Sequence, residues 1–105
     1  YMPRGKCPVC FIGELGPGMA VNRQYKNIGP RLSIVSNTGE LIARLGGEDG
    51  PGPELGKFWS PHGLSVDSFG DIYVGEVSYT NWKNLNGDVP RPEYLRSLQK
   101  LERVV

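Results

Sequence analysis

A five-residue sequence motif occurs twice in the chain, and it constrains the fold more than any other feature. The copies are Phe11-Ile12-Gly13-Glu14-Leu15 and Tyr73-Val74-Gly75-Glu76-Val77, which share an aromatic residue, a β-branched residue, Gly, Glu and an aliphatic residue in that order. A long polar loop and then an alternating apolar segment follow each copy. Internal repetition is the sequence signature of folds built from stacked units. The repeat also puts a glutamate at an equivalent place in each unit.

A second, shorter internal repeat predicts two β-hairpins. The segment from Val35 to Leu41 matches the segment from Val66 to Ile72, and in each a tight turn ends in Gly before an acidic residue and a new strand. Glycine suits a hairpin loop whose last residue takes a positive φ. With the strand of the first repeat copy, we expect strands at residues 10–15, 31–36, 40–45, 63–67 and 71–77.

The C-terminal segment is open to two interpretations. Leu95, Leu98 and Leu101 are three residues apart, which fits one face of a helix that Pro92 could start. The repeat instead makes residues 97–105 equivalent to the strand at 31–36. This equivalence favours a strand.

Composition supports an all-β domain and argues against two classes of partner. The chain has 105 residues, enough for one small domain. Its 15 Gly and nine Pro cluster between short β-branched runs, which is an all-β pattern. The net charge is +1 with no basic run, and no apolar stretch approaches the ~20 residues of a membrane helix. We therefore expect neither nucleic acid nor a membrane as a partner.

The strand order predicts a β-propeller fragment of about two blades. Antiparallel four-stranded meanders repeated radially are propeller blades. We assign residues 1–46 to the second to fourth strands of one blade, residues 47–62 to the crossing between blades, and residues 63–105 to the first to third strands of the next. Because the chain starts and stops within the repeat, we expect it to be a piece of a longer protein whose remaining blades pack against it.

The segment from Phe58 to Val74, FWSPHGLSVDSFGDIYV, resembles an NHL repeat. That family's pattern is an aromatic residue, Pro and a small residue, a strand ending in Val-Asp, a turn Gly and then Ile-Tyr-Val. The resemblance implies a six-bladed propeller. Because His62 follows Pro61, this segment is most similar to the bacterial relatives of the peptidyl-hydroxyglycine amidating lyases. The gluconolactonase-like hydrolases are more distantly similar.

The same resemblance implies a metal ligand and two alternative functions. In the amidating lyases, a His in this Pro-His context binds zinc in the central channel, and His62 matches it. One expectation is a metal-assisted lyase or hydrolase that uses zinc or calcium and acts on a small molecule or peptide. The alternative is a non-catalytic propeller that binds a protein or small ligand on its loop face. Many NHL copies carry an Asp after Ile-Tyr-Val, whereas this chain has Gly75-Glu76, and the longer acid changes the reach into the channel.

Hairpin geometry predicts that His62, Glu76 and Glu14 share one rim. His62 precedes the first strand of a hairpin and Glu76 ends the second, so both lie at the same edge of the sheet. Glu14 is their equivalent in the neighbouring blade. Histidine and carboxylates are metal ligands and acid–base groups, so the two glutamates are candidate catalytic residues. The alternative is that both acids accept structural hydrogen bonds from arginine or from backbone N–H groups.

Other motifs favour structural roles. Cys7 and Cys10 form a CxxC, but no second pair completes a zinc ribbon, and the motif runs into a strand. Asp67 and Asp71 flank a turn that they are expected to cap. The Gly-rich segment of residues 46–52 lacks the Lys-Ser/Thr of a phosphate loop.

The aromatic residues are open to two interpretations. Tyr79 and Trp82, with Asn81, follow Glu76 on the same rim, where they could wall a ligand pocket or pack over the neighbouring blade. Phe58 and Trp59 precede the inner strand, and we expect them to pack between blades.

Overall fold

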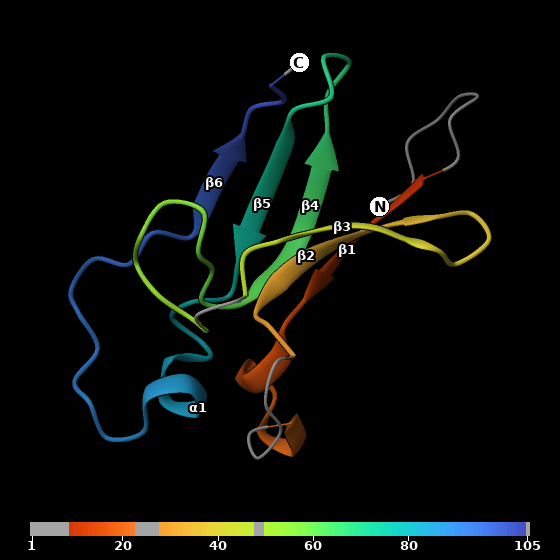
Figure 1. Ribbon diagram of the computed structural model, residues 1–105. Helices are drawn as coiled ribbons and strands as arrows, with labels where there is room; N and C mark the ends of the chain where they lie inside the picture. The colour runs from red at the N-terminus through yellow and green to blue at the C-terminus, as the bar shows by residue number, and fades with distance from the viewer. Residues whose placement is uncertain (1–8, 23–27, 48–49, 105) are drawn as a thin grey trace.

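Two antiparallel three-stranded sheets make up most of the protein. The computed structural model describes residues 9–22, 28–47 and 50–104. Sheet A has the strand order β1 (Val9–Glu14), β2 (Arg31–Ser36), β3 (Leu41–Leu45), and sheet B has the order β4 (Pro61–Val66), β5 (Ile72–Glu76), β6 (Leu98–Leu101). The sheets meet where β1 lies beside β4 (Figure 1). The expectation of an all-β fold is confirmed at this level, and the repeat's preference for a C-terminal strand is confirmed by β6.

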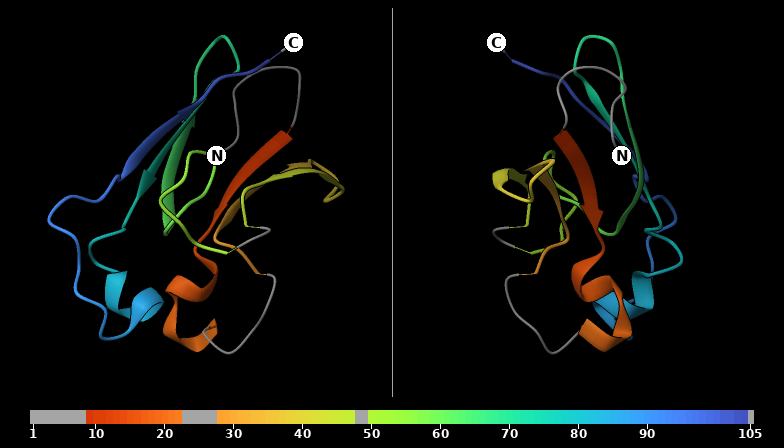
Figure 2. Two further views of the ribbon diagram at one scale, coloured as in Figure 1. Left: turned by 60° about the vertical axis from the view of Figure 1, so that its left-hand side comes forward. Right: turned by 90° about the vertical axis from the view of Figure 1, so that its right-hand side faces the viewer.

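Short helical turns occur in segments that we expected to be loops. They are α1 (Trp82–Asn86) and the 3-10 helices η1 (Gly16–Gly18) and η2 (Ala20–Asn22). All three lie beyond the ends of β1 and β5, and η1 contacts α1 (Figure 2). Their five or fewer residues carry no helical periodicity long enough to detect in the sequence. No helix in the described part of the chain is long and apolar enough to cross a membrane.

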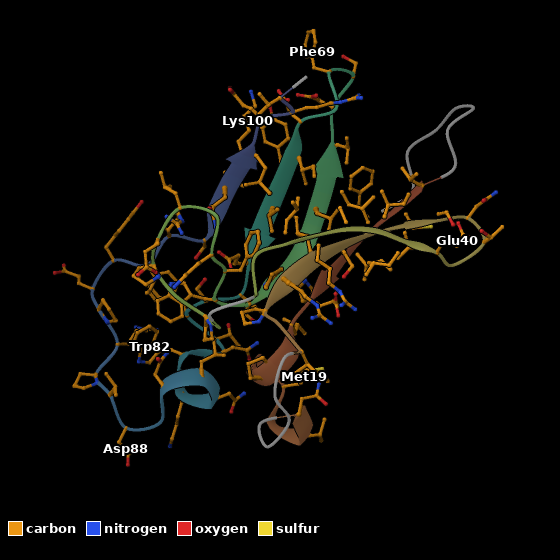
Figure 3. All side chains as sticks on the ribbon, in the orientation of Figure 1. Met19, Glu40, Phe69, Trp82, Asp88 and Lys100 are labelled. Atoms are coloured by element: carbon orange, nitrogen blue, oxygen red, sulfur yellow. The ribbon has the colours of Figure 1, made fainter. Side chains whose placement is uncertain are left out.

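The two predicted hairpin turns are present and have the same internal bonds. In the first, Ser36 N donates to Glu40 O and Gly39 N donates to Ser36 O. In the second, Asp67 N donates to Asp71 O and Gly70 N donates to Asp67 O. The two glycines have φ values of +88° and +86°, the left-handed conformation that glycine adopts without strain. Phe69, which is labelled in Figure 3, lies at the exposed tip of the second turn.

Strand pairing follows the sequence repeat residue by residue. Gly13 pairs with Leu32 in sheet A, and Gly75 pairs with Leu98 in sheet B. Glu14 lies opposite Arg31, and the backbone N–H of Glu76 donates to Ser97 O. The pair β1–β2 therefore corresponds to the pair β5–β6 in the same register. β4 has no counterpart among the described strands of sheet A.

The main core fills the space between the sheets. Its buried members are Leu32 from β2, Phe58 from the crossing segment, and Ile72 and Val74 from β5. Phe11 and Leu64 pack against this cluster from β1 and β4. The expected role of Phe58 in packing between the two sheets is therefore observed. A Cβ at Gly13 would lie 3.5 Å from Leu64 Cδ2, so this position faces sheet B across a close β1–β4 contact.

Candidate functional site

The rim proposed from the sequence corresponds to one end of the strands. β1 ends at Glu14 and β5 ends at Glu76, while β4 begins at Pro61, directly opposite Glu76. His62 follows Pro61 at a register shift, where β4 carries one residue more than β5. Its side chain is exposed, whereas Pro61 is fully buried. Bulges of this kind redirect a side chain and are frequent beside functional sites.

Glu76 is buried and holds the chain that leads into β4. Its Oε1 accepts hydrogen bonds from the backbone N–H groups of Trp59 at 2.6 Å and Ser60 at 2.8 Å. Its Oε2 is buried and makes no hydrogen bond of normal geometry, and the Gln99 side chain, which also donates to Lys57 O, lies nearby. Burial raises the pKa of Glu76. The hydrogen bonds from the backbone of Ser60 and Trp59, the Gln99 side chain and the charge of Arg96 only partly offset that effect.

Glu14 is half-buried and forms an ion pair. Its carboxylate accepts hydrogen bonds from Arg31 Nε at 3.0 Å and Arg31 Nη2 at 3.2 Å, and from the hydroxyl of Ser33. Partial burial raises the pKa of Glu14, but the bonds from Arg31 and Ser33 and the charges of Arg31 and Arg44 outweigh it. The pKa of Glu14 therefore lies below its usual value.

The two glutamates share one end of the strands but point into different spaces. Glu76 lies on the same face of β5 as Ile72 and Val74, which face sheet A. Glu14 follows Gly13, which faces sheet B, so its side chain lies on the opposite face of sheet A. One carboxylate is thus held by backbone N–H groups and the other by arginine. Their proposed catalytic role stays a prediction.

The aromatic residues near the rim form a second, smaller core. Trp59 and Trp82 pack edge to face with their ring centroids 5.2 Å apart, and Leu95 is buried with them. Trp82 Nε1 donates to Val89 O. Tyr79 is partly exposed, and its hydroxyl accepts a hydrogen bond from the backbone N–H of Leu95. Trp59 and Trp82 thus pack against each other and Leu95, whereas the expected packing against the neighbouring unit and the pocket role of Tyr79 stay predictions.

Remaining sequence candidates lie away from the rim. Asp67 Oδ1 accepts hydrogen bonds from Phe69 N and Asp71 N, so it caps its turn as expected. Cys10 is a free thiol in β1, while Cys7 lies outside the described residues. Among the described residues, no three His, Cys, Asp or Glu side chains gather closely enough to hold a metal ion.

A hollow of about 630 Å³ opens beside Glu14 at the end of β1. Leu15, Met19 and Ile28 supply apolar walls, and Glu14 and Asn22 supply polar groups. Small-ligand sites combine mostly apolar walls with a few polar groups in this way. Sequence reasoning did not identify Met19, Asn22 or Ile28, because they come from a loop that carries no motif. The partners of Glu14 could have been found, since Arg31 and Ser33 alternate along the predicted strand that follows the first repeat copy.

The pKa shifts predict opposite pH dependences for the two glutamates. Glu14, with a lowered pKa, stabilises the fold above the ordinary value of 4.5, and this contribution is lost as the pH falls through its folded-state pKa. Glu76, with a raised pKa, binds its proton more tightly in the folded protein, so its contribution is present below 4.5 and is lost as the pH rises through its folded-state pKa. Urea unfolding of Glu14→Gln and Glu76→Gln between about pH 3 and pH 7 should show opposite slopes relative to the unmodified chain. Parallel pH profiles would contradict the assigned environments.

Comparison with known proteins gives no match: no protein-family model matches this chain, and neither a curated protein nor a solved structure is significantly similar to it.

Proposed function

We propose that this chain forms two consecutive units of a repeat-built β-scaffold, of the NHL propeller type that the sequence resembles, and that it binds a small molecule or peptide at the strand-end rim. The observation that carries this proposal is the shared register of β1–β2 and β5–β6. The match extends the sequence repeat to the backbone pairing. In the propeller arrangement, each three-stranded sheet corresponds to part of a four-stranded blade.

The hollow beside Glu14 is the proposed ligand site. It lies at the loop end of the scaffold, where repeat folds carry their variable binding residues. Its carboxylate and the Asn22 amide suit a ligand with amide or hydroxyl groups, and Met19, Leu15 and Ile28 suit a short apolar group. Both glutamates are engaged in bonds that hold the fold, which favours binding over catalysis by these acids.

The test uses an uncharged acetylated dipeptide amide with one leucine side chain as the probe. Amide chemical shifts of the ¹⁵N-labelled chain should change in a saturable way at residues 13–16 and at Ile28. Met19→Arg, which places a long charged side chain in the hollow, should weaken the response at least about tenfold, a loss of about 1.4 kcal/mol in binding free energy.

Val21→Arg is the matched control, because Val21 lies in the neighbouring η2, is exposed and does not line the hollow. It should leave the response unchanged. Shift changes spread evenly over both sheets, or an equal response in the two variants, would contradict a site in the hollow.

His62 supports a second candidate function, a metal-assisted lyase or hydrolase that uses zinc or calcium. The specific observation is its exposed side chain at the bulge that starts β4, on a segment that Glu76 holds in place. In this proposal His62 supplies one ligand and other units supply the rest. Zinc titration followed by the NMR signals of the imidazole should give weak binding that His62→Ala removes. Unchanged imidazole signals at saturating zinc would count against this candidate.

A further inference from the structure

The outer faces of the two sheets keep apolar residues at positions that are buried elsewhere in the chain. Leu32 in sheet A is 0% exposed, whereas its repeat equivalent in sheet B, Leu98, is 66% exposed. The reverse holds for a pair of residues in the neighbouring strands. Val74 in sheet B is 0% exposed, while its repeat equivalent in sheet A, Ile12, is 43% exposed. Each position is thus covered in one sheet and open in the other.

This pattern follows from the way in which the sheets stack. Sheet A turns the face with Leu32 toward sheet B, and sheet B turns the face with Val74 toward sheet A. The sheets therefore meet through two different faces of the repeat unit, and not through the same face of each unit. The contact is heterologous, and a heterologous contact can be repeated at both ends.

We infer that the two outer faces bind each other, so that a second copy of this chain docks head to tail. The face with Ile12 in one copy would cover the face with Leu98 and Tyr73 in the next. The contact follows the stacking order of the chain's own two sheets, and it brings together the repeat equivalents of Leu32 and Val74. It does not depend on the ligand site or on the metal candidate. Among the described residues, sheet A has no counterpart of β4, the strand that contacts β1 inside the chain, so we expect weak affinity.

The basic measurement is sedimentation velocity of the 105-residue chain over a range of concentrations. The mean mass should rise with concentration, beginning in the micromolar range of weak complexes, about −8 kcal/mol or weaker. Leu98→Glu and Ile12→Glu each place a charge on one outer face, and each should weaken association at least about tenfold. Leu55→Glu is the matched control, because Leu55 is 87% exposed in the crossing segment and belongs to neither sheet. It should associate like the unmodified chain.

A mixture of the two face variants separates head-to-tail docking from other kinds of contact. The Leu98→Glu variant keeps its Ile12 face, and the Ile12→Glu variant keeps its Leu98 face. Mixed at equal concentration, they should form a heterodimer that grows no further, at a concentration where each variant alone stays largely monomeric. Circular dichroism of each variant verifies that both are folded. A monomeric unmodified chain at several hundred micromolar, or no heterodimer in a mixture of folded variants, would overturn the inference.

Discussion

Leu32→Ala is expected to lower the free energy of unfolding by about 2–5 kcal/mol, as deletion of a fully buried leucine side chain does. Leu98→Ala changes the same residue type at the equivalent repeat position. Because Leu98 is largely exposed and Leu32 is fully buried, Leu98→Ala should change the free energy of unfolding by about 0.5 kcal/mol or less in dilute solution. Urea unfolding at low micromolar concentration measures both values.

The comparison tests the stacking of the sheets as well as the burial of one side chain. The repeat makes the two leucines equivalent, since each lies in the strand that follows one copy of the repeat and pairs with the glycine of that copy, Leu32 with Gly13 and Leu98 with Gly75. Equal losses in the two variants at low concentration would mean that the outer face of sheet B, which carries Leu98 and is turned away from sheet A, is covered within the single chain. That result would contradict the arrangement of the two sheets. A loss for Leu98→Ala that grows with protein concentration would instead follow from the head-to-tail contact.

Glu76→Ala is expected to destabilise the fold by about 2–4 kcal/mol. The change leaves the buried backbone N–H groups of Trp59 and Ser60 without an acceptor, and each such loss costs about 1–3 kcal/mol. These two groups lie in the segment that enters β4, so the start of that strand should loosen first. Hydrogen exchange at residues 59–63 would detect this local opening alongside global unfolding.

Two further variants separate the hydrogen bonds of Glu76 from its charge. Glu76→Gln keeps an acceptor oxygen and removes the charge that burial disfavours, so it should cost clearly less than Glu76→Ala near neutral pH. Glu14→Ala removes a partly exposed ion pair, which contributes about 0–1 kcal/mol. If Glu76→Ala were no more harmful than Glu14→Ala, the buried carboxylate would not hold the segment in the way that its bonds indicate.

The sequence by itself determined the local structure to a large extent. Period-two alternation and the turn glycines located five strands to within about two residues, since hairpins depend on neighbouring residues and on the φ that Gly39 and Gly70 can adopt. The repeat favoured β6 over a helix at the C-terminus, where spacing alone was ambiguous. It also placed Glu14 and Glu76 at equivalent strand ends, which the pairing of β1 and β5 confirms.

Only the tertiary structure decided what those equivalent residues contact. Glu14 and Glu76 have chemically similar neighbours in sequence, yet Glu14 bonds to Arg31 and Glu76 bonds to the backbone of Trp59 and Ser60. Leu32 and Leu98 likewise differ because one faces the second sheet and the other does not. A repeat fixes the covalent and strand-level environment of a residue, but burial depends on which sheet packs on which face. That choice is made by long-range contacts, above all β1 against β4, which no local pattern in the sequence encodes.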